Sequence, residues 1–438
     1  MALLWVTEAV PLAVTALVPL AAFPAIGIVS LEKTAQAYAH PLIFLFMGGF
    51  MLGAAIERWQ LHQRLALAVI SVSGRRPRAL VLAMMCATAF LSLWVSNTAT
   101  AMMMVPIATS LLAARGSGQS TAAGDPLGAA MMLGIAFAAT IGGIGSLIGT
   151  PPNALFAAYM QEAHGIAIGF GRWMLIGLPI VLVLLPLTWL LLTRFAFHLP
   201  DQDLPISAFP TSMPAMTVPE RIVATVLAIT ALAWIVRPFL TEGLGLTWLS
   251  DAGIAITAAL ALFLLPAHRP GSRTLLEWDD VKGIRWDVLI LFGGGLALAD
   301  AIVATGLTTW IGDRISDLHG VPTPVLVLAM MIVIVYLGEL ASNTAVAAIF
   351  LPIAGAAAAG IGAAPLELVL PVALAASLGF MLPVATPPNA IVYGSGSVTA
   401  QQMLRAGALL DVVAILIVYL AVALLAQPVL GEWPGSGR

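Results

Sequence analysis

Two short stretches decide the fold: LWVSNTAT at Leu93–Thr100 and LASNTAV at Leu340–Val346. Both carry Ser-Asn-Thr, and the second copy lies 246 residues after the first. About fifteen apolar residues precede each motif and about fourteen follow it, fewer than the roughly 20 that a helix needs to cross a bilayer. We therefore predict that each motif lies at the tip of a re-entrant hairpin, over residues 79–112 and 323–356.

The composition places the chain in a membrane. Of 438 residues, 61% are hydrophobic and 9% are charged, against roughly 45–50% and about 25% in soluble domains. Several apolar segments are long enough to span a bilayer and alternating strand patterns are absent, which predicts an all-α polytopic protein with about 9–10 transmembrane spans. A net charge of −3 gives no basic surface for nucleic acid, and the single cysteine excludes an internal disulfide.

The same offset of 246 residues recurs elsewhere in the chain, which indicates an internal duplication. Phe46-Met47-Gly48-Gly49 matches Phe292-Gly293-Gly294-Gly295, and Pro106 matches Pro352. Further on, Gly149-Thr150-Pro151-Pro152-Asn153 matches Ala385-Thr386-Pro387-Pro388-Asn389 at the shorter offset of 236. Each half thus carries a Gly-rich helix, a Ser-Asn-Thr hairpin and a helix interrupted at Thr-Pro-Pro-Asn.

The duplication divides the chain into three parts. Residues 1–198 form the first repeat, with a broken helix at 128–160, and residues 199–219 form a polar cytoplasmic linker. Residues 220–430 form the second repeat, with a broken helix at 366–397. Because a hairpin makes no net crossing, the second half has an odd number of spans, which inverts one half relative to the other. Residues 3–23 predict one further membrane helix.

The positive charges predict an orientation. With the N-terminus in the cytoplasm, 13 of the 18 Lys and Arg residues fall on the cytoplasmic side, as the positive-inside rule requires. We therefore expect a multi-pass protein of a bacterial inner membrane. Residues 57–78 mix charged and apolar side chains, which favours an amphipathic surface helix over a soluble loop. The 13 Lys and Arg residues expected on the cytoplasmic side are Arg58, Arg64, Arg75, Arg76, Arg78, Arg115, Arg194, Arg221, Arg269, Arg273, Lys282, Arg285 and Arg405.

The paired motifs predict a binding site at mid-membrane. An unsatisfied polar group there costs several kcal/mol, so two opposed polar tips indicate ions or a polar ligand. Ser, Thr and Asn side chains suit carboxylate oxygens without a fixed charge, and carbonyls freed at helix breaks suit alkali cations. The broken helices are also expected to add N-terminal amides. A single such motif would more often be helix–helix contact or a kink.

Four acidic residues lie in or near apolar segments, where ionisable side chains are commonly functional. Glu339 lies three residues before Ser342, so it is expected to tune the site or a hairpin gate. The other three are expected nearer the interfaces; they are Glu8, Asp300 and Asp411.

Over nearly its whole length the chain resembles the divalent anion:sodium symporter family. The resemblance rests on both paired motifs and on Trp5–Pro19, Leu42–Leu61 and Leu289–Ala299. It implies a homodimer in which a scaffold domain holds a mobile transport domain that moves like an elevator. It also implies one substrate site at the hairpin tips and helix breaks. The implied residues are Ser96, Asn97, Thr98, Thr150, Pro151, Ser342, Asn343, Thr344, Thr386 and Pro387.

The resemblance further implies two sodium sites. The first would use Ser92, Ser96, Asn97 and Gly149, and the second Gly338, Ala341, Asn343 and Ala385. At the offset of 246, Ser92 is matched by Gly338, so the second site lacks a hydroxyl. The sodium stoichiometry, and even sodium dependence, therefore stay open.

The leading hypothesis is sodium-coupled uptake of C4-dicarboxylates such as succinate, fumarate or malate. Importing an anion against the membrane potential costs about 2.3 kcal/mol per charge per 100 mV, which cations must offset. Sodium-independent dicarboxylate exchange and symport of sulfate, citrate or tartrate are the alternatives. A passive anion channel would share the polar re-entrant segments. We do not expect an enzyme, because zinc-ligand spacing and Gly-x-Ser-x-Gly are absent.

Overall fold

A computed structural model describes residues 1–7, 9–72, 74, 76–114, 125–199, 215–246, 248–269, 271–316 and 321–430. Within these ranges the chain is mostly helical. Seven of the described helices are long and apolar enough to cross a membrane, and further apolar helices are shorter. The predicted class, an all-α polytopic membrane protein, is confirmed. Glu8, Arg75, Arg115, Arg438 and most of the predicted linker, residues 200–214, lie outside the described residues.

The elements fall into two series, one on each side of the linker. The first series is α1 (Ala2–Thr7), α2 (Leu12–Thr15), α3 (Val18–Ala25), α4 (Leu31–Ala37), α5 (Pro41–Arg58), α6 (Leu61–Val72), α7 (Pro77–Ser92), α8 (Asn97–Ala114), α9 (Pro126–Ile144), α10 (Pro151–His164), α11 (Phe170–Leu190) and the π-helix η1 (Leu191–Ala196). The second is α12 (Val218–Leu244), α13 (Asp251–Leu264), β1 (Pro266–Arg269), β2 (Ser272–Thr274), α14 (Trp278–Val281), α15 (Trp286–Ala304), α16 (Leu307–Ser316), α17 (Thr323–Gly338), α18 (Asn343–Ile361), α19 (Pro365–Ala375), α20 (Pro387–Gly394) and α21 (Ala400–Leu430).

The two Ser-Asn-Thr motifs lie between consecutive helices. α7 ends at Ser92 and α8 begins at Asn97, while α17 ends at Gly338 and α18 begins at Asn343. α7 and α17 have 16 residues each, so each is about 24 Å long at 1.5 Å per residue, short of the roughly 30 Å hydrocarbon core. These two pairs of short helices, each joined by a turn, cover the residues predicted to form the hairpins. Whether they re-enter the bilayer stays a prediction.

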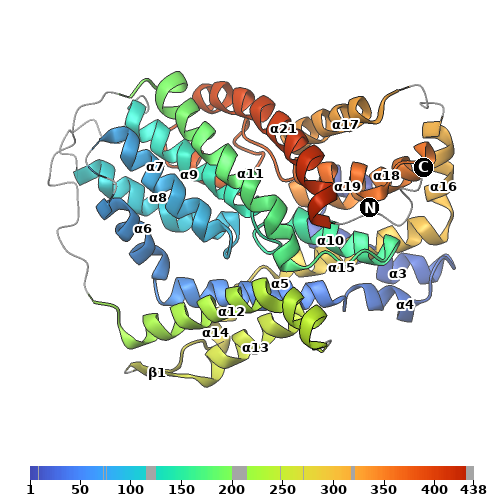
Figure 1. Ribbon diagram of the computed structural model, residues 1–438, viewed down its shortest axis with the longest axis horizontal. Helices are drawn as coiled ribbons and strands as arrows, with labels where there is room; N and C mark the ends of the chain where they lie inside the picture. The colour runs from blue at the N-terminus through green and yellow to red at the C-terminus, as the bar shows by residue number, and fades with distance from the viewer. Residues whose placement is uncertain are drawn as a thin grey trace.

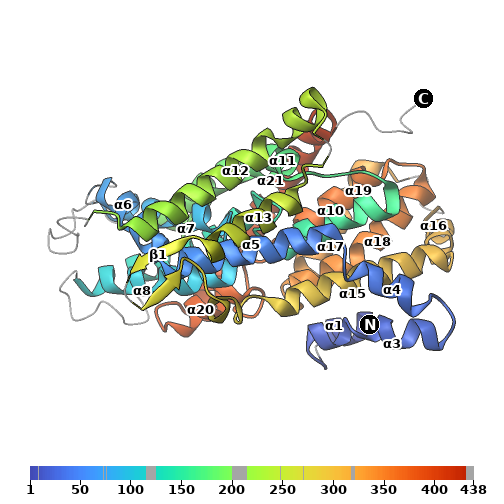
Figure 2. The same cartoon turned by 90° about the horizontal axis from the view of Figure 1, so that it is seen from below.

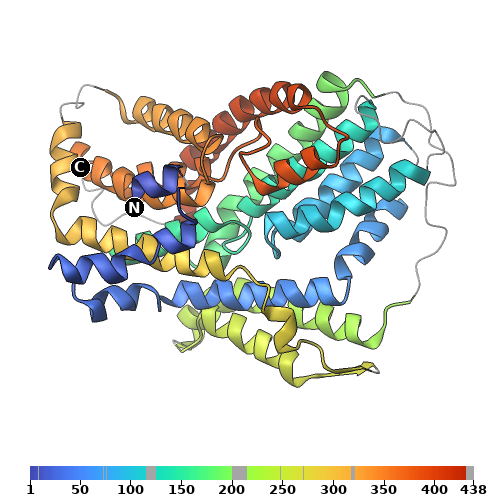
Figure 3. The same ribbon diagram turned by 180° about the vertical axis from the view of Figure 1, so that it is seen from behind.

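The two helix breaks carry the chain from one half toward the hairpin of the other. α9 and α10 are separated by Gly145–Thr150, and α19 and α20 by Ala376–Thr386. Beyond its break, α10 packs against α15 and α18 of the second half, and α20 packs against α8 and α9 of the first (Figure 3). This exchange brings both breaks and both hairpin turns together. The inverted relation of the halves stays a prediction.

The hairpins lie toward opposite ends of the molecule, with α9, α10 and α11 running between them (Figure 1). α5, α12 and α13 form a separate layer along one side, where α13 packs against both α5 and α12 (Figure 2). An aromatic stack joins this layer to the first hairpin turn: the rings of Trp94 and Trp234 are 6.5 Å apart, and those of Trp234 and Phe170 are 4.2 Å apart.

The repeated Gly-rich helices use corresponding glycines for close packing. A Cβ on Gly48 of α5 would lie 2.7 Å from Ala255 Cβ, and a Cβ on Gly294 of α15 would lie 2.6 Å from Ala16 Cβ. Distances this short leave no room for a side chain. The duplicated sequence is therefore matched by a duplicated packing contact.

The expectation of one membrane helix over residues 3–23 is wrong. Pro11 caps the start of α2, and Pro19 lies in the first turn of α3. Proline has no N–H and its ring disfavours helix in the residue before it, so the segment divides into three short helices.

Two surface elements also differ from the sequence expectation. The predicted amphipathic helix over 57–78 is shorter, because α5 continues to Arg58 and α6 covers only Leu61–Val72. β1 and β2 form an antiparallel ribbon, which alternation could not reveal in strands of four and three residues. The Nε1–H of Trp59 donates to Leu275 O at 2.8 Å and anchors the end of this ribbon to α5.

We expect Gly142→Ala to destabilise the protein, because a Cβ there would lie 2.4 Å from Ala89 O where α7 packs on α9. Overpacking of this kind costs about 1–3 kcal/mol, so the melting temperature of the purified protein in detergent should fall by several degrees. Gly243→Ala in α12 is the control, since no described atom beyond its chain neighbours and its own helix backbone lies within 4 Å of its Cβ position. Equal melting temperatures for the two variants would contradict this packing.

Candidate functional site

The two hairpin turns and the two helix breaks surround a central pocket of ≈ 560 Å³. All ten residues implied as substrate ligands line it, whereas Ser92 and Gly338 lie just behind its wall. From the first half the lining includes Ser96, Asn97, Thr98, Gly149, Thr150 and Pro151, and from the second Ala341, Ser342, Asn343, Thr344, Ala385, Thr386 and Pro387. The structure thus gathers four sequence motifs, all of uncharged residues, into the lining of one cavity.

The backbone amide donors of this pocket come from the hairpins and not from the broken helices. α10 begins with Pro151–Pro152, which have no N–H, and the Asn153 N–H donates to Thr150 O at 3.2 Å. α20 begins with Pro387–Pro388 in the same way. The expectation that these helix ends supply free amides is therefore wrong. The first N–H groups of α8 and α18 have no intrahelical partner, and they belong to the Ser-Asn-Thr motifs.

A cluster of oxygens surrounds the Asn97 amide behind the first hairpin turn. One amide atom lies 2.7 Å from Ser92 Oγ, 3.0 Å from Ala139 O and 3.2 Å from Gly149 O. With the nitrogen in that place the amide donates to all three oxygens. With Oδ1 there, four oxygens converge, which is the donor set that a hard cation prefers. Three of the four residues implied for the first sodium site, Ser92, Asn97 and Gly149, meet here.

The second hairpin turn contains a matching amide. Asn343 Oδ1 is buried and has no hydrogen-bond partner among the described residues. A Cβ on Gly338 would lie 3.3 Å from that oxygen, so the glycine that replaces Ser92 in the repeat leaves space beside it. An unpaired buried oxygen is costly, and a cation would satisfy it. The residues here fit a sodium ion with one hydroxyl fewer than at Asn97.

The last residue of each Thr-Pro-Pro-Asn motif closes its own helix break. Asn153 Nδ2 donates to Gly143 O at 3.0 Å and Ser146 O at 2.8 Å. Asn389 Nδ2 donates to Leu382 O at 3.0 Å, and Gly379 O lies at 3.5 Å. In each half the carbonyls lie ten and seven residues before the asparagine. Sequence reasoning missed this role, although both asparagines were visible in the repeated motif.

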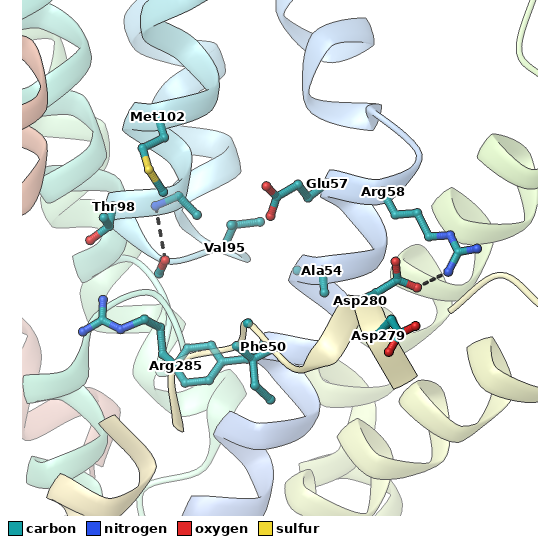
Figure 4. A pocket seen from close by; sticks show the side chains of 15 residues that line it. Phe50, Ala54, Glu57, Arg58, Val95, Thr98, Met102, Asp279, Asp280 and Arg285 are labelled. Carbon is teal, nitrogen blue, oxygen red and sulfur yellow. Dashed lines mark hydrogen bonds and ion pairs between the residues drawn. The ribbon is translucent and has the colours of Figure 1, made fainter. Parts of the chain in front are cut away.

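A second cavity, which we call the vestibule, adjoins the central pocket. It has a volume of ≈ 460 Å³ and shares Phe50, Ser96, Thr98 and Arg285 with the central pocket. Figure 4 shows its charged residues, with Arg58 directed at Asp280. Arg58 Nη2 also donates to Glu277 Oε1 at 3.0 Å, and this bond lowers the pKa of the Glu277 carboxyl.

A family model described as the sodium:sulfate symporter transmembrane region matches residues 1–433. The chain belongs to this family. It is a membrane transporter and not an enzyme, and the divalent anion:sodium symporter resemblance is confirmed.

Relatives within this symporter family span almost the whole chain. The sodium-dependent dicarboxylate transporter SdcS of Staphylococcus saprophyticus is 38% identical over 441 residues, covering 98% of this chain and 84% of that protein. SdcS of Staphylococcus aureus is 38% identical over 438 residues with the same coverage. The crystal structure of the Alcanivorax borkumensis YdaH transporter, described as having an unusual topology, aligns with a TM-score of 0.61 at 14% identity, over 92% of this chain and 90% of that one. This last similarity concerns the fold alone.

Glu339 closes the second break of the symporter fold from outside it. Its Oε1 accepts hydrogen bonds from the N–H groups of Phe380 at 2.7 Å and Met381 at 2.9 Å, and its Oε2 accepts from Leu382 N–H at 2.8 Å. The side chain is 2% exposed. The residue thus fastens the end of α17 to the segment that leads to Thr386.

Two other acidic residues, Asp411 and Asp300, lie away from the pocket lining. Asp411 of α21 is fully buried next to Glu339, and its expected place near a membrane interface stays a prediction. Its helix packs against α11, α17 and α19, which cover it on several sides. Asp300 lies near the C-terminal end of α15, in a separate cavity with Lys33 and His40.

We expect Glu339→Gln to weaken the second break, because a neutral amide offers one acceptor oxygen where three N–H groups now meet a carboxylate. Hydrogen bonds to a charged group contribute about 1.5–3 kcal/mol, so both the melting temperature and the uptake rate should fall clearly. Glu367→Gln, in the first turn of α19, is the matched control. A Glu339→Gln variant with unchanged stability and uptake would contradict the bracing role.

Proposed function

We propose that this symporter-family protein carries out sodium-coupled uptake of C4-dicarboxylates such as succinate, fumarate or malate. The observation that carries the proposal is the convergence of two Ser-Asn-Thr turns on one pocket, with an oxygen cluster behind one turn and an unpaired amide oxygen in the other. The names of the 38% identical relatives support sodium and dicarboxylate as the transported species.

The pocket offers two sets of carboxylate donors, one from each hairpin. Thr98 and Thr344 supply hydroxyl groups, and the N-termini of α8 and α18 supply amides and a favourable helix dipole. A dicarboxylate has two anionic groups separated by a short carbon chain, so each hairpin can receive one of them. A single compact anion such as sulfate would engage both sets less well.

The amide of Asn97 links sodium to the substrate in this proposal. When its oxygen faces Ser92 Oγ, Ala139 O and Gly149 O, its nitrogen is turned from that cluster and can donate to a carboxylate. When its nitrogen bonds to the cluster, as it can without a cation, its oxygen is turned toward the anion and repels it. Sodium binding therefore favours the amide orientation that binds substrate, which couples the two.

The elevator movement, the homodimer and the cytoplasmic N-terminus belong to the same proposal. The hairpins and breaks pack mainly on one another, whereas α5, α12 and α13 form a separate layer. In this proposal the hairpins and breaks form the transport domain that carries the pocket. The layer of α5, α12 and α13 belongs to the scaffold past which that domain moves. In the proposed orientation the vestibule faces the cytoplasm of a bacterial inner membrane, because Arg58 and Arg285 lie on the Lys/Arg-rich side.

Purified protein in liposomes should accumulate labelled succinate when sodium is higher outside than inside, because the sodium gradient must drive the dianion. Choline should not replace sodium. Preloading the liposomes with unlabelled succinate tests the second candidate function, sodium-independent exchange. The missing hydroxyl at Gly338 favours this candidate because it removes one ligand from the second sodium site. Accumulation that does not depend on sodium but requires preloading would establish an exchanger. Accumulation of sulfate but not of succinate would refute the proposed substrate.

Ser92→Ala should weaken sodium binding while the pocket lining stays intact. The variant removes one of four oxygens in the Asn97 cluster, and losing one polar contact of about 1–1.5 kcal/mol predicts a rise of roughly five- to tenfold in the sodium concentration for half-maximal uptake. Ser110→Ala, on the same hairpin but hydrogen-bonded to Pro106 O, should leave it unchanged. The same sodium dependence in both variants would exclude the cluster as a sodium site.

A further inference from the structure

Arg285 stands where the two cavities meet. It lines both the vestibule and the central pocket. Among the residues that the structure describes, it is the one charged side chain in the lining of the central pocket. We propose that Arg285 receives one carboxylate of the substrate as it passes between vestibule and pocket, and so determines the affinity for dianions. This inference rests on the function proposed above.

The position of Arg285 follows from the start of α15. It is the N-cap residue of that helix, immediately before Trp286, at the end of the segment that follows α14. In Figure 4 its side chain extends toward the side of the vestibule where the first hairpin turn carries Thr98, away from the pair formed by Arg58 and Asp280. A substrate that moves from the vestibule toward Thr98 therefore passes the guanidinium group.

The present partner of Arg285 is one that a substrate can replace. Arg285 Nε donates to Asp287 Oδ1 at 2.9 Å, and Nη2 donates to Oδ2 at 2.9 Å. The two side chains are 41% and 55% exposed, and ion pairs exposed to this degree contribute little to stability. A substrate carboxylate has the same shape and charge as Asp287, so the guanidinium can exchange one for the other with both hydrogen bonds retained.

The other vestibule arginine is not free to do this. Arg58 is 16% exposed and interacts with Asp280, Glu277 and Ser272 at once. Releasing it would leave two carboxylates without their cation. Arg58 therefore fixes β2 and α14 to the end of α5, and Arg285 remains as the arginine that can reach the ligand.

The rest of the vestibule would repel a dianion. Its described lining contains three carboxylates, Glu57, Asp279 and Asp280, against the two arginines. Removing the charge of Arg285 leaves three acids facing one arginine that is already paired. Like charges in a narrow cavity lower the local concentration of an anion, so the passage depends on Arg285.

The experiment compares four variants of the full-length protein in liposomes. Arg285→Gln removes the charge, Arg285→Lys keeps the charge without the planar fork, and Asp287→Asn removes the competing carboxylate. Lys282→Gln removes a nearby cation, paired with Asp279 on α14, that lines neither cavity. Initial rates of succinate uptake at saturating sodium give KM and Vmax separately, and succinate-dependent melting temperatures in detergent measure binding without transport.

We expect Arg285→Gln to raise the succinate KM about tenfold or more, since it removes a charge-assisted bidentate contact. Vmax should change less, and the melting temperature without succinate should stay near wild type because the Asp287 pair is exposed. Arg285→Lys should lie in between, Asp287→Asn should lower KM, and Lys282→Gln should stay within twofold of wild type. Added choline chloride should raise KM in the wild type and less in Arg285→Gln.

The outcomes separate this inference from the proposed function. Wild-type protein that takes up no C4-dicarboxylate under a sodium gradient would refute the function. Wild-type uptake together with an unchanged KM in Arg285→Gln, or an equal rise in Lys282→Gln, would refute the role of Arg285 alone. If Arg285→Gln lowers the melting temperature without succinate, the other two variants test the role of Arg285. A higher KM in Arg285→Lys together with a lower KM in Asp287→Asn would support the exchange of carboxylates, and any other pair of shifts would refute it.

Discussion

The structure depends on how the two interrupted helices satisfy their own backbone. Helix ends inside a membrane leave carbonyl and amide groups without partners, at a cost of several kcal/mol for each unsatisfied group. Here Asn153 and Asn389 donate to the carbonyls of their breaks, and Trp173 Nε1 donates to Ile144 O at 2.8 Å. Only because these groups are paired internally can the chain stop two helices at the level of the hairpin turns and leave a cavity between them.

The cavity then takes its chemistry from what is left unpaired. The proline pairs remove the first backbone N–H groups of α10 and α20, so the Ser-Asn-Thr turns supply the backbone amides. Behind the first turn, the Asn97 amide lies next to hydroxyl and carbonyl oxygens. Behind the second turn, the Asn343 amide oxygen has no hydrogen-bond partner among the described residues. In the proposed function, substrate and ion lie on opposite sides of the same two side chains, which is why we propose that their binding is linked.

Much of this arrangement follows from the sequence because duplication repeats it. Two copies of each motif at nearly constant spacing predicted the turns and the breaks, and the family resemblance implied which residues line one pocket. The early prolines were visible, but apolar composition outweighed them in the reading of residues 3–23. Contacts between distant segments were beyond reach: no pattern in the sequence says that Glu339 reaches the N–H groups of Phe380–Leu382. Arg285 was read only as one of many cytoplasmic charges, because position along the chain cannot show that two cavities meet beside it.

The two helix breaks are closed by different kinds of side chain. The first is held by neutral groups, whereas the second also needs the Glu339 carboxylate from the end of α17, buried beside Asp411. A copy of the first half placed in the second position would lack that acid. The two halves are therefore not interchangeable at their breaks, since among the described residues only the second break is closed by a charged side chain.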